Sequence, residues 1–82
     1  MDDTKILSLV SEALESVAPG RSTELHKVGL SGKVSDLGID SVATMEMVGA
    51  IEDKLGCTFP DEELVAVNSL QDLAGMIRRN NE

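Results

Sequence analysis

Asp36-Leu37-Gly38-Ile39-Asp40-Ser41-Val42, with the helical run that follows it to Leu55, is the stretch around which the chain is organised. A short glycine-containing turn leads into a helix, and either Asp40 or Ser41 is suited to cap that helix. Gly56 stands where a left-handed residue would end it. Ser41 therefore lies at a helix N-terminus, where unpaired N–H groups and the helix dipole favour an anion such as a phosphate.

The predicted helix over 41–55 has two differently composed faces. One face repeats with helical spacing and is expected to face the core: Thr44, Met47, Val48, Ile51 and Leu55. The other face is apolar beside Ser41 and acidic farther along: Val42, Met45, Glu46, Gly49, Glu52 and Asp53. An exposed apolar patch with a carboxylate rim suits docking on a basic protein surface. We therefore predict that this second face binds protein partners.

The segments before this helix predict one more long helix and a long connection. Thr4 can cap a helix that runs to Val17, where Pro19-Gly20 ends it. Residues 20–35 carry several glycines and no sustained period, so we predict a long loop there, with room for a short helical turn over 23–27.

The segments after it predict a short helix and a third long one. Pro60 biases Phe59 away from helix, and Phe59 is expected to fill the core. A brief helix over 60–65 follows, and Ser69 with Asp72 resembles a capping box that opens the last helix. Residues expected to be buried in that last helix are Leu70, Leu73, Ala74 and Ile77. The fold class is all-α, a four-helix antiparallel bundle of three longer helices and one short helix, with frayed ends over 1–3 and 80–82.

Composition limits the function. The 82 residues make one small domain, 1–82, and the net charge of −8 disfavours nucleic acid and anionic membranes as partners. No stretch is long and apolar enough for a membrane span, and the Met1-Asp2-Asp3 start does not resemble a signal peptide. We therefore expect a cytoplasmic monomer whose partners are proteins with basic patches.

Other chemistry finds little support in the residues. Ser41 as a catalytic nucleophile would need a base, and the single histidine, His26, falls in the glycine-rich segment without a Gly-x-Ser-x-Gly elbow. The acidic residues do not follow the spacing of a calcium-binding loop. A single cysteine, Cys57, and a single histidine are too few ligands for a structural zinc site. We expect no metal and no catalytic residue; the plain alternative for Ser41 is a helix cap alone.

The motifs resemble those of acyl carrier proteins over residues 34–77. Residues 36–41 reproduce the Asp-Leu-Gly-x-Asp-Ser pattern of that family, residues 45–52 are similar to its recognition helix, and Phe59-Pro60-Asp61-Glu62-Glu63 is similar to its Ile-Pro-Asp-Glu-Glu segment. The resemblance implies that Ser41, preceded by Asp40, receives 4′-phosphopantetheine from a phosphopantetheinyl transferase. The arm would carry acyl thioesters to partners such as ligases, ketosynthases or acyltransferases. A further hypothesis is that the aliphatic bundle opens to shelter the acyl chain between its helices.

Three departures from the family pattern bear on the pathway. Val42 stands where leucine is usual, and Lys54 interrupts the acidic run. The loop over 20–35 is longer and more glycine-rich than in the common fatty-acid carriers, with Lys33 near a position that is usually apolar. These departures favour polyketide or other secondary-metabolite biosynthesis, with primary fatty acid biosynthesis left open. The alternative function is an unmodified adaptor that keeps the fold and binds a basic protein through the acidic helix.

Overall fold

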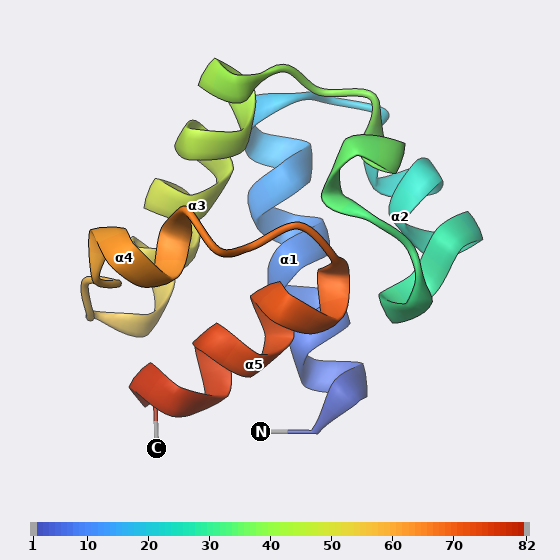
Figure 1. Ribbon diagram of the computed structural model, residues 1–82. Helices are drawn as coiled ribbons and strands as arrows, with labels where there is room; N and C mark the ends of the chain where they lie inside the picture. Colours follow the sequence, from blue (N-terminus) through green and yellow to red (C-terminus); the bar gives the residue numbers. More distant parts are fainter. Residues whose placement is uncertain (1, 82) are drawn as a thin grey trace.

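The computed structural model describes residues 2–81, and Met1 and Glu82, parts of the ends predicted to fray, lie outside the described residues. Figure 1 shows three longer helices, α1 (Asp3–Val17), α3 (Ser41–Leu55) and α5 (Leu70–Asn81), around one core. The short α4 (Asp61–Leu64) joins α3 to α5. Within residues 2–81 no strand forms, and the extended pairing is an isolated antiparallel bridge between Lys33 and Ser69. The predicted all-α fold with three longer helices is confirmed, and a second short helix, α2 (Ser22–Val28), forms in addition to α4.

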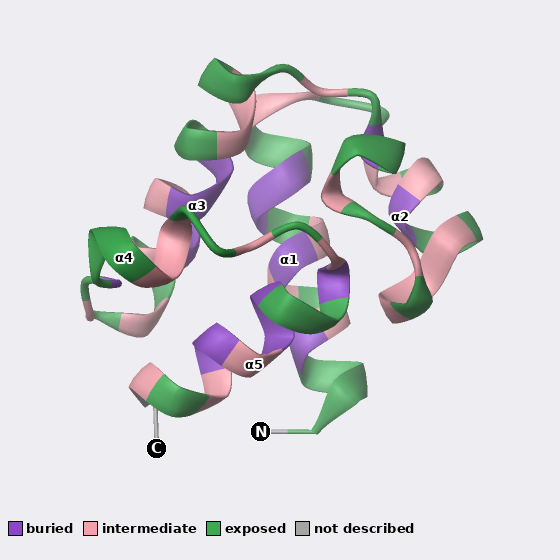
Figure 2. Cartoon of the chain, in the orientation of Figure 1, coloured by how far each residue is buried: buried purple, intermediate pink, exposed green. Residues whose placement is uncertain are grey.

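The core is aliphatic and is supplied mainly by the three longer helices. Figure 2 shows the buried residues on the sides of these helices that face one another. The buried set is Ile6, Val10, Ala13, Leu14, Leu25, Leu37, Met47, Val48, Ile51, Phe59, Leu70, Leu73, Ala74, Met76 and Ile77. The stripe predicted on α3 is confirmed for Met47, Val48 and Ile51, whereas Thr44 and Leu55 are only half-buried. Phe59, 2% exposed, fills the core as expected.

The predicted loop over 20–35 is wrong in most of its length. The segment forms α2 (Ser22–Val28) and the 3-10 turn η1 (Gly29–Ser31), and a second 3-10 turn, η2 (Val34–Leu37), follows Lys33. The short helical turn allowed over 23–27 lies within α2, but the sequence pattern did not give its full extent because two turns supply too few positions for an apolar period. A single fully buried residue, Leu25, anchors this helix to the core. Packing against α1, rather than local propensity, therefore makes the segment helical.

Both ends of the described chain are more ordered than predicted. Thr4 was expected to cap α1, but the cap is Asp2, whose carboxylate accepts a hydrogen bond of 2.9 Å from the Lys5 N–H. Asn80 was expected to fray, but it lies in α5, and its Nδ2 donates to Glu63 Oε2 and to the Met76 carbonyl. These bonds hold the last turn of α5 because they satisfy groups that would otherwise face solvent alone.

Carboxylates fix the beginning of α5 and its contact with α4. Ser69 and Asp72 form the predicted capping box: Asp72 Oδ2 accepts from the Ser69 N–H at 3.1 Å, and Ser69 Oγ accepts from the Asp72 N–H at 3.0 Å. The backbone N–H groups of Ser69 and Asn68 lower the pKa of the Asp72 carboxyl. Glu63 on α4 accepts from Arg79 Nε at 2.7 Å, and hydrogen bonds from Asn80 and Arg79 lower the pKa of Glu63.

Candidate functional site

The turn before α3 positions the serine through a left-handed glycine and two hydrogen bonds to Asp40. Gly38 has φ of +71°, a left-handed conformation that glycine adopts without strain. Asp40 is the N-cap: its Oδ1 accepts from the Ala43 N–H at 2.8 Å, and its carbonyl accepts from Thr44 Oγ1 at 2.8 Å. Of the two caps that the sequence allowed, the structure therefore selects Asp40. Because Asp40 supplies the cap, Ser41 is not needed for it.

Ser41 is the first residue of α3, and it is exposed. Within residues 2–81 the structure gives its hydroxyl no hydrogen-bond partner. The unpaired N–H groups and the positive end of the helix dipole lie beside it. This arrangement leaves the oxygen accessible for modification and favours a negative group bound to it.

Ser41 lies in an open groove between the η2 region and α3. The groove is lined by Lys33, Val34, Ser35, Ile39, Asp40, Ser41, Thr44, Met45, Val67 and Asn68. No histidine is among the described residues of this lining, and the Asp40 carboxylate beside Ser41 accepts the Ala43 N–H through Oδ1 as the helix cap. His26 is exposed on α2, not in a loop as predicted, and Cys57 is half-buried.

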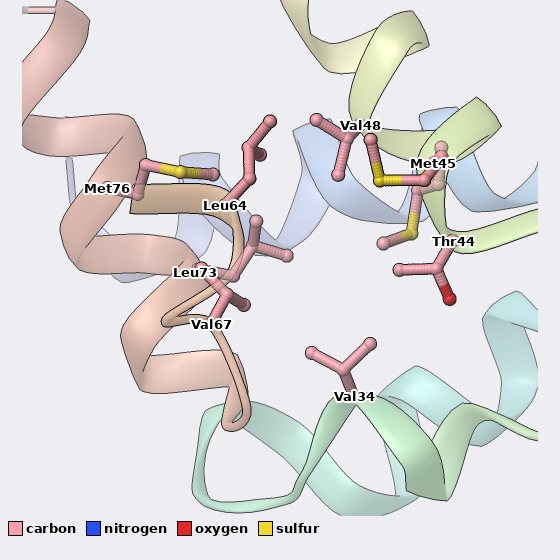
Figure 3. Close-up of a pocket in the computed structure, with 9 residues that line it drawn as sticks. Val34, Thr44, Met45, Val48, Leu64, Val67, Leu73 and Met76 are labelled. Atoms are coloured by element: carbon pink, nitrogen blue, oxygen red, sulfur yellow. The ribbon is translucent and has the colours of Figure 1, made fainter. Parts of the chain in front are cut away.

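A second, smaller cavity adjoins the groove and is almost wholly apolar. Val34, Thr44, Met45 and Val67 line both spaces. Figure 3 shows that side chains from η2, α3, α5 and the segment around α4 converge on this cavity. Its volume is about 50 Å³, enough for a few water-sized groups. The groove beside Ser41 therefore leads to an apolar space between the helices.

The predicted partner face of α3 is exposed where it is apolar. Val42 is 67% exposed and Met45, which lines the groove, is 54% exposed, and Glu46 and Asp53 are exposed carboxylates. Lys54, which interrupts the acidic run, is directed to α1, where its Nζ lies 3.2 Å from Glu12 Oε2. An apolar patch with negative charge around it results.

Two residues of that predicted face are less exposed. Gly49 and Glu52 are half-buried, and a Cβ at Gly49 would meet open space. Glu52 Oε2 accepts a hydrogen bond of 2.7 Å from the Phe59 N–H. Glu52 therefore fixes the connection that inserts Phe59 into the core, a structural contact that helix periodicity did not predict.

Sequence reasoning missed several residues around the site. Val65, just after α4, is 82% exposed, the most exposed large hydrophobic residue among those described. Lys33, Val67 and Asn68 line the groove although they lie far from Ser41 in the chain. The pairing of residues 33–34 with 68–69 brings these segments together, through the Lys33–Ser69 bridge and the bond of 3.0 Å from the Val34 N–H to the Asn68 carbonyl. No local signal in the sequence predicts this pairing.

Residues 2–81 contain no helix long and apolar enough to cross a membrane. The same residues hold no group of three or more His, Cys, Asp or Glu side chains placed to bind a metal ion.

Comparison with known proteins defines the class to which this fold and site belong. Residues 4–77 match the family described as "Phosphopantetheine attachment site". The chain therefore belongs to the phosphopantetheine-attachment domains, which are non-catalytic carriers. The cofactor of this class is 4′-phosphopantetheine, and the accessible, unbonded hydroxyl in the groove fits such a group.

Within that class, two relatives that match along most of their length are named as an acyl carrier protein or its homolog. The chain is 31% identical over 64 residues to an acyl carrier protein homolog of Ureaplasma parvum, covering 78% of this chain and 83% of that protein. It is 23% identical over 78 residues to an acyl carrier protein of Rickettsia bellii, covering 94% and 91%. The chain is a member of the acyl carrier protein family, as its motifs indicated. No solved structure matches it.

A third relative places the same domain in a much larger protein. The chain is 34% identical over 73 residues to 3-methylorcinaldehyde synthase of a Phoma species. This match covers 88% of the chain and 3% of the synthase. Similar domains therefore occur both as short proteins and as small parts of a long one.

Proposed function

We propose that the chain carries acyl groups as thioesters on a 4′-phosphopantetheine arm attached to Ser41, and that it delivers them to partner enzymes. The observation that carries the proposal is the Ser41 hydroxyl, which is exposed and unbonded within the described residues, at the start of α3 in an attachment-site family. The arm's terminal thiol supplies the thioester chemistry. The chain's own residues supply the attachment point and a surface for docking.

Attachment requires only an accessible oxygen on this chain. In the proposed step, Ser41 Oγ forms a P–O bond to the pantetheine-bearing phosphorus of coenzyme A, and the P–O bond within the pyrophosphate breaks. Adenosine 3′,5′-bisphosphate leaves, and the hydroxyl proton passes to a base of the phosphopantetheinyl transferase. Asp40 supports this step because its cap keeps the first turn of α3 formed while the serine oxygen stays outside the backbone hydrogen-bond network.

We infer that partners dock on the exposed part of α3. Val42 and Met45 supply apolar contact next to the attachment point, and Glu46 and Asp53 attract basic partner residues. Glu52 and Gly49 belong to the same face and contribute less area because they are half-buried. The partner classes in this proposal are the transferase and acyl-loading and acyl-processing enzymes: ligases, ketosynthases and acyltransferases.

The cargo and pathway belong to the same proposal. A tethered thioester is effective because the carrier raises its local concentration at each partner site. The small apolar cavity beside the groove supports transient shelter of an acyl chain, which would enter past Val34 and Met45 and widen the space between the helices. Fatty acid, polyketide or other secondary-metabolite biosynthesis are the contexts we propose, with the domain 1–82 acting as one monomeric unit in the cytoplasm.

Intact mass after incubation with coenzyme A and a phosphopantetheinyl transferase tests the proposal. We expect the wild-type chain to gain the mass of one arm, S41A to gain nothing, and S8A, a matched exposed serine on α1, to gain as much as wild type. Modification at another residue, or none with several transferases, would contradict the assignment. No modification with several transferases would favour the alternative function, an unmodified adaptor that binds a protein partner through the same exposed face of α3.

A further inference from the structure

Lys33 brings a positive charge into the groove that holds Ser41. It is the one cationic side chain among the ten described residues that line the groove. Its backbone is held firmly: the Lys33 N–H donates to Asp36 Oδ2 at 3.0 Å, and the residue pairs with Ser69 in the isolated bridge. The side chain itself is exposed, so a fixed backbone carries a mobile ammonium group at the edge of the groove.

The Lys33 ammonium makes no ion pair within residues 2–81, unlike most of the basic side chains described. The ion-paired basic residues are Lys27 with Glu24, Lys54 with Glu12, Arg78 with Asp3 and Arg79 with Glu63. Among residues 2–81, therefore, no carboxylate is paired with the Lys33 ammonium. In a protein with a net charge of −8, such a cation is available to an anion from outside.

The groove has one fixed negative charge, the Asp40 carboxylate, next to the proposed attachment point. A phosphodiester on Ser41 would add a second negative charge to the same space. Two like charges at close range repel each other, and a cation that can reach both lowers that repulsion. A lysine in the groove lining is therefore complementary to the modified site.

We propose that Lys33 binds the phosphodiester of the arm attached at Ser41 and holds the first part of the arm in the groove. The inference rests on the proposed attachment at Ser41 and assigns Lys33 as a positioning residue for the arm. The neighbouring residue Val34 lines both the groove and the apolar cavity. An arm held at its phosphodiester thus begins beside the apolar space, before a partner withdraws it.

The experiment uses the holo protein made with a transferase and coenzyme A, in which the arm provides the only phosphorus atom. The ³¹P transverse relaxation rate is compared between wild type, K33A, K33R and K27A, and the Lys33 side-chain NMR signals are compared before and after arm attachment in wild type and K27A. K27A removes an exposed lysine that is ion-paired on α2 and is not part of the groove, so it serves as the matched control. Circular dichroism verifies that each variant is folded.

We expect the Lys33 side-chain signals to shift when the arm is attached and the Lys27 signals to stay in place. In K33A the ratio of bound to free phosphodiester should fall about two- to five-fold, which is the effect expected from the loss of one exposed ion pair. The ³¹P transverse relaxation should become slower, because the released phosphodiester moves more freely. K33R should restore the wild-type rate, K27A should match wild type, and salt near 1 M should remove the difference.

Two results would overturn the inference, and intact mass distinguishes them. If Ser41 gains the arm while the ³¹P relaxation rate is the same in wild type and K33A, and the Lys33 signals of wild type are the same before and after attachment, the assignment of Lys33 is wrong and the carrier function stands. If Ser41 gains no arm with any transferase, the carrier function and the role of Lys33 fall together.

Discussion

Removing the Glu52 carboxylate tests whether this residue of the predicted partner face of α3 also stabilises the fold. Glu52 is half-buried, and its Oε2 accepts a short hydrogen bond of 2.7 Å from the Phe59 N–H. In E52A this N–H loses its charged acceptor next to a core residue that is 2% exposed. Hydrogen bonds to charged groups contribute about 1.5–3 kcal/mol when protected, and partial exposure reduces this to about 1–2 kcal/mol.

Glu46 provides the matched control, because it lies on the same face and is exposed, with no hydrogen bond to it in the described chain. We expect E46A to change the free energy of unfolding by less than about 0.5 kcal/mol. For a domain of this size, about 1–2 kcal/mol corresponds to a fall in Tm of about 4–16 °C for E52A. E52Q, whose amide oxygen can still accept the bond, should lie between the two.

Urea unfolding followed by far-ultraviolet circular dichroism measures the difference, since the chain has no Trp or Tyr to report by fluorescence. Equal stability of E52A and E46A would refute the structural role of Glu52. The consequence for partner assays is direct: slower acyl transfer by E46K is attributable to docking, whereas slower transfer by E52K also includes a loss of stability.

The remaining predictions concern the turn before α3, the core and acid stability. G38A should lower the free energy of unfolding by about 1–2 kcal/mol, measured by urea titration, because φ of +71° strains any Cβ and Arg21 lies 3.1 Å from its position; equal stability would contradict this. F59A should cost about 3–5 kcal/mol and leave little folded protein by circular dichroism at 25 °C, whereas a native spectrum and Tm would show that Phe59 is not the core's anchor. The lowered pKa values of Glu63 and Asp72 stabilise the fold above their ordinary values of 4.5 and 3.8, and this stability is lost as pH falls through the lower folded values. Unfolding free energy should thus fall less steeply below pH 4.5 in E63Q than in wild type, and parallel curves would argue against the contribution of Glu63.

The helices with strong local signals were predictable from the chain itself. The α3 prediction held at both ends because a capping carboxylate and a glycine with positive φ are local features that act within one turn. The capping box of α5 held for the same reason. The segment 20–35 was predicted as a loop with room for a helical turn over 23–27, and the full extent of α2 was missed because a two-turn helix with one buried anchor, Leu25, depends on packing against the core.

The candidate site divides in the same way. Ser41 as a helix-opening residue and Val42 and Met45 as an exposed apolar pair follow from spacing alone, since helical period determines which residues share a face. The structural duty of Glu52 does not follow from spacing, because the Phe59 N–H reaches it only after the chain turns back beyond Gly56. A residue that looks solvent-directed on a helical wheel can still be the partner of a returning segment.

By itself the sequence determined the all-α class, the acyl carrier protein family and the position of the serine that we propose as the attachment point, since motifs and caps act over a few residues. Only the tertiary structure decided the surroundings of that serine. Lys33, Val67 and Asn68 meet Ser41 in one groove because the 33–34 and 68–69 segments pair across the bundle. Such pairing depends on how α5 packs on the rest of the core, and long-range packing leaves no trace in the spacing of nearby residues.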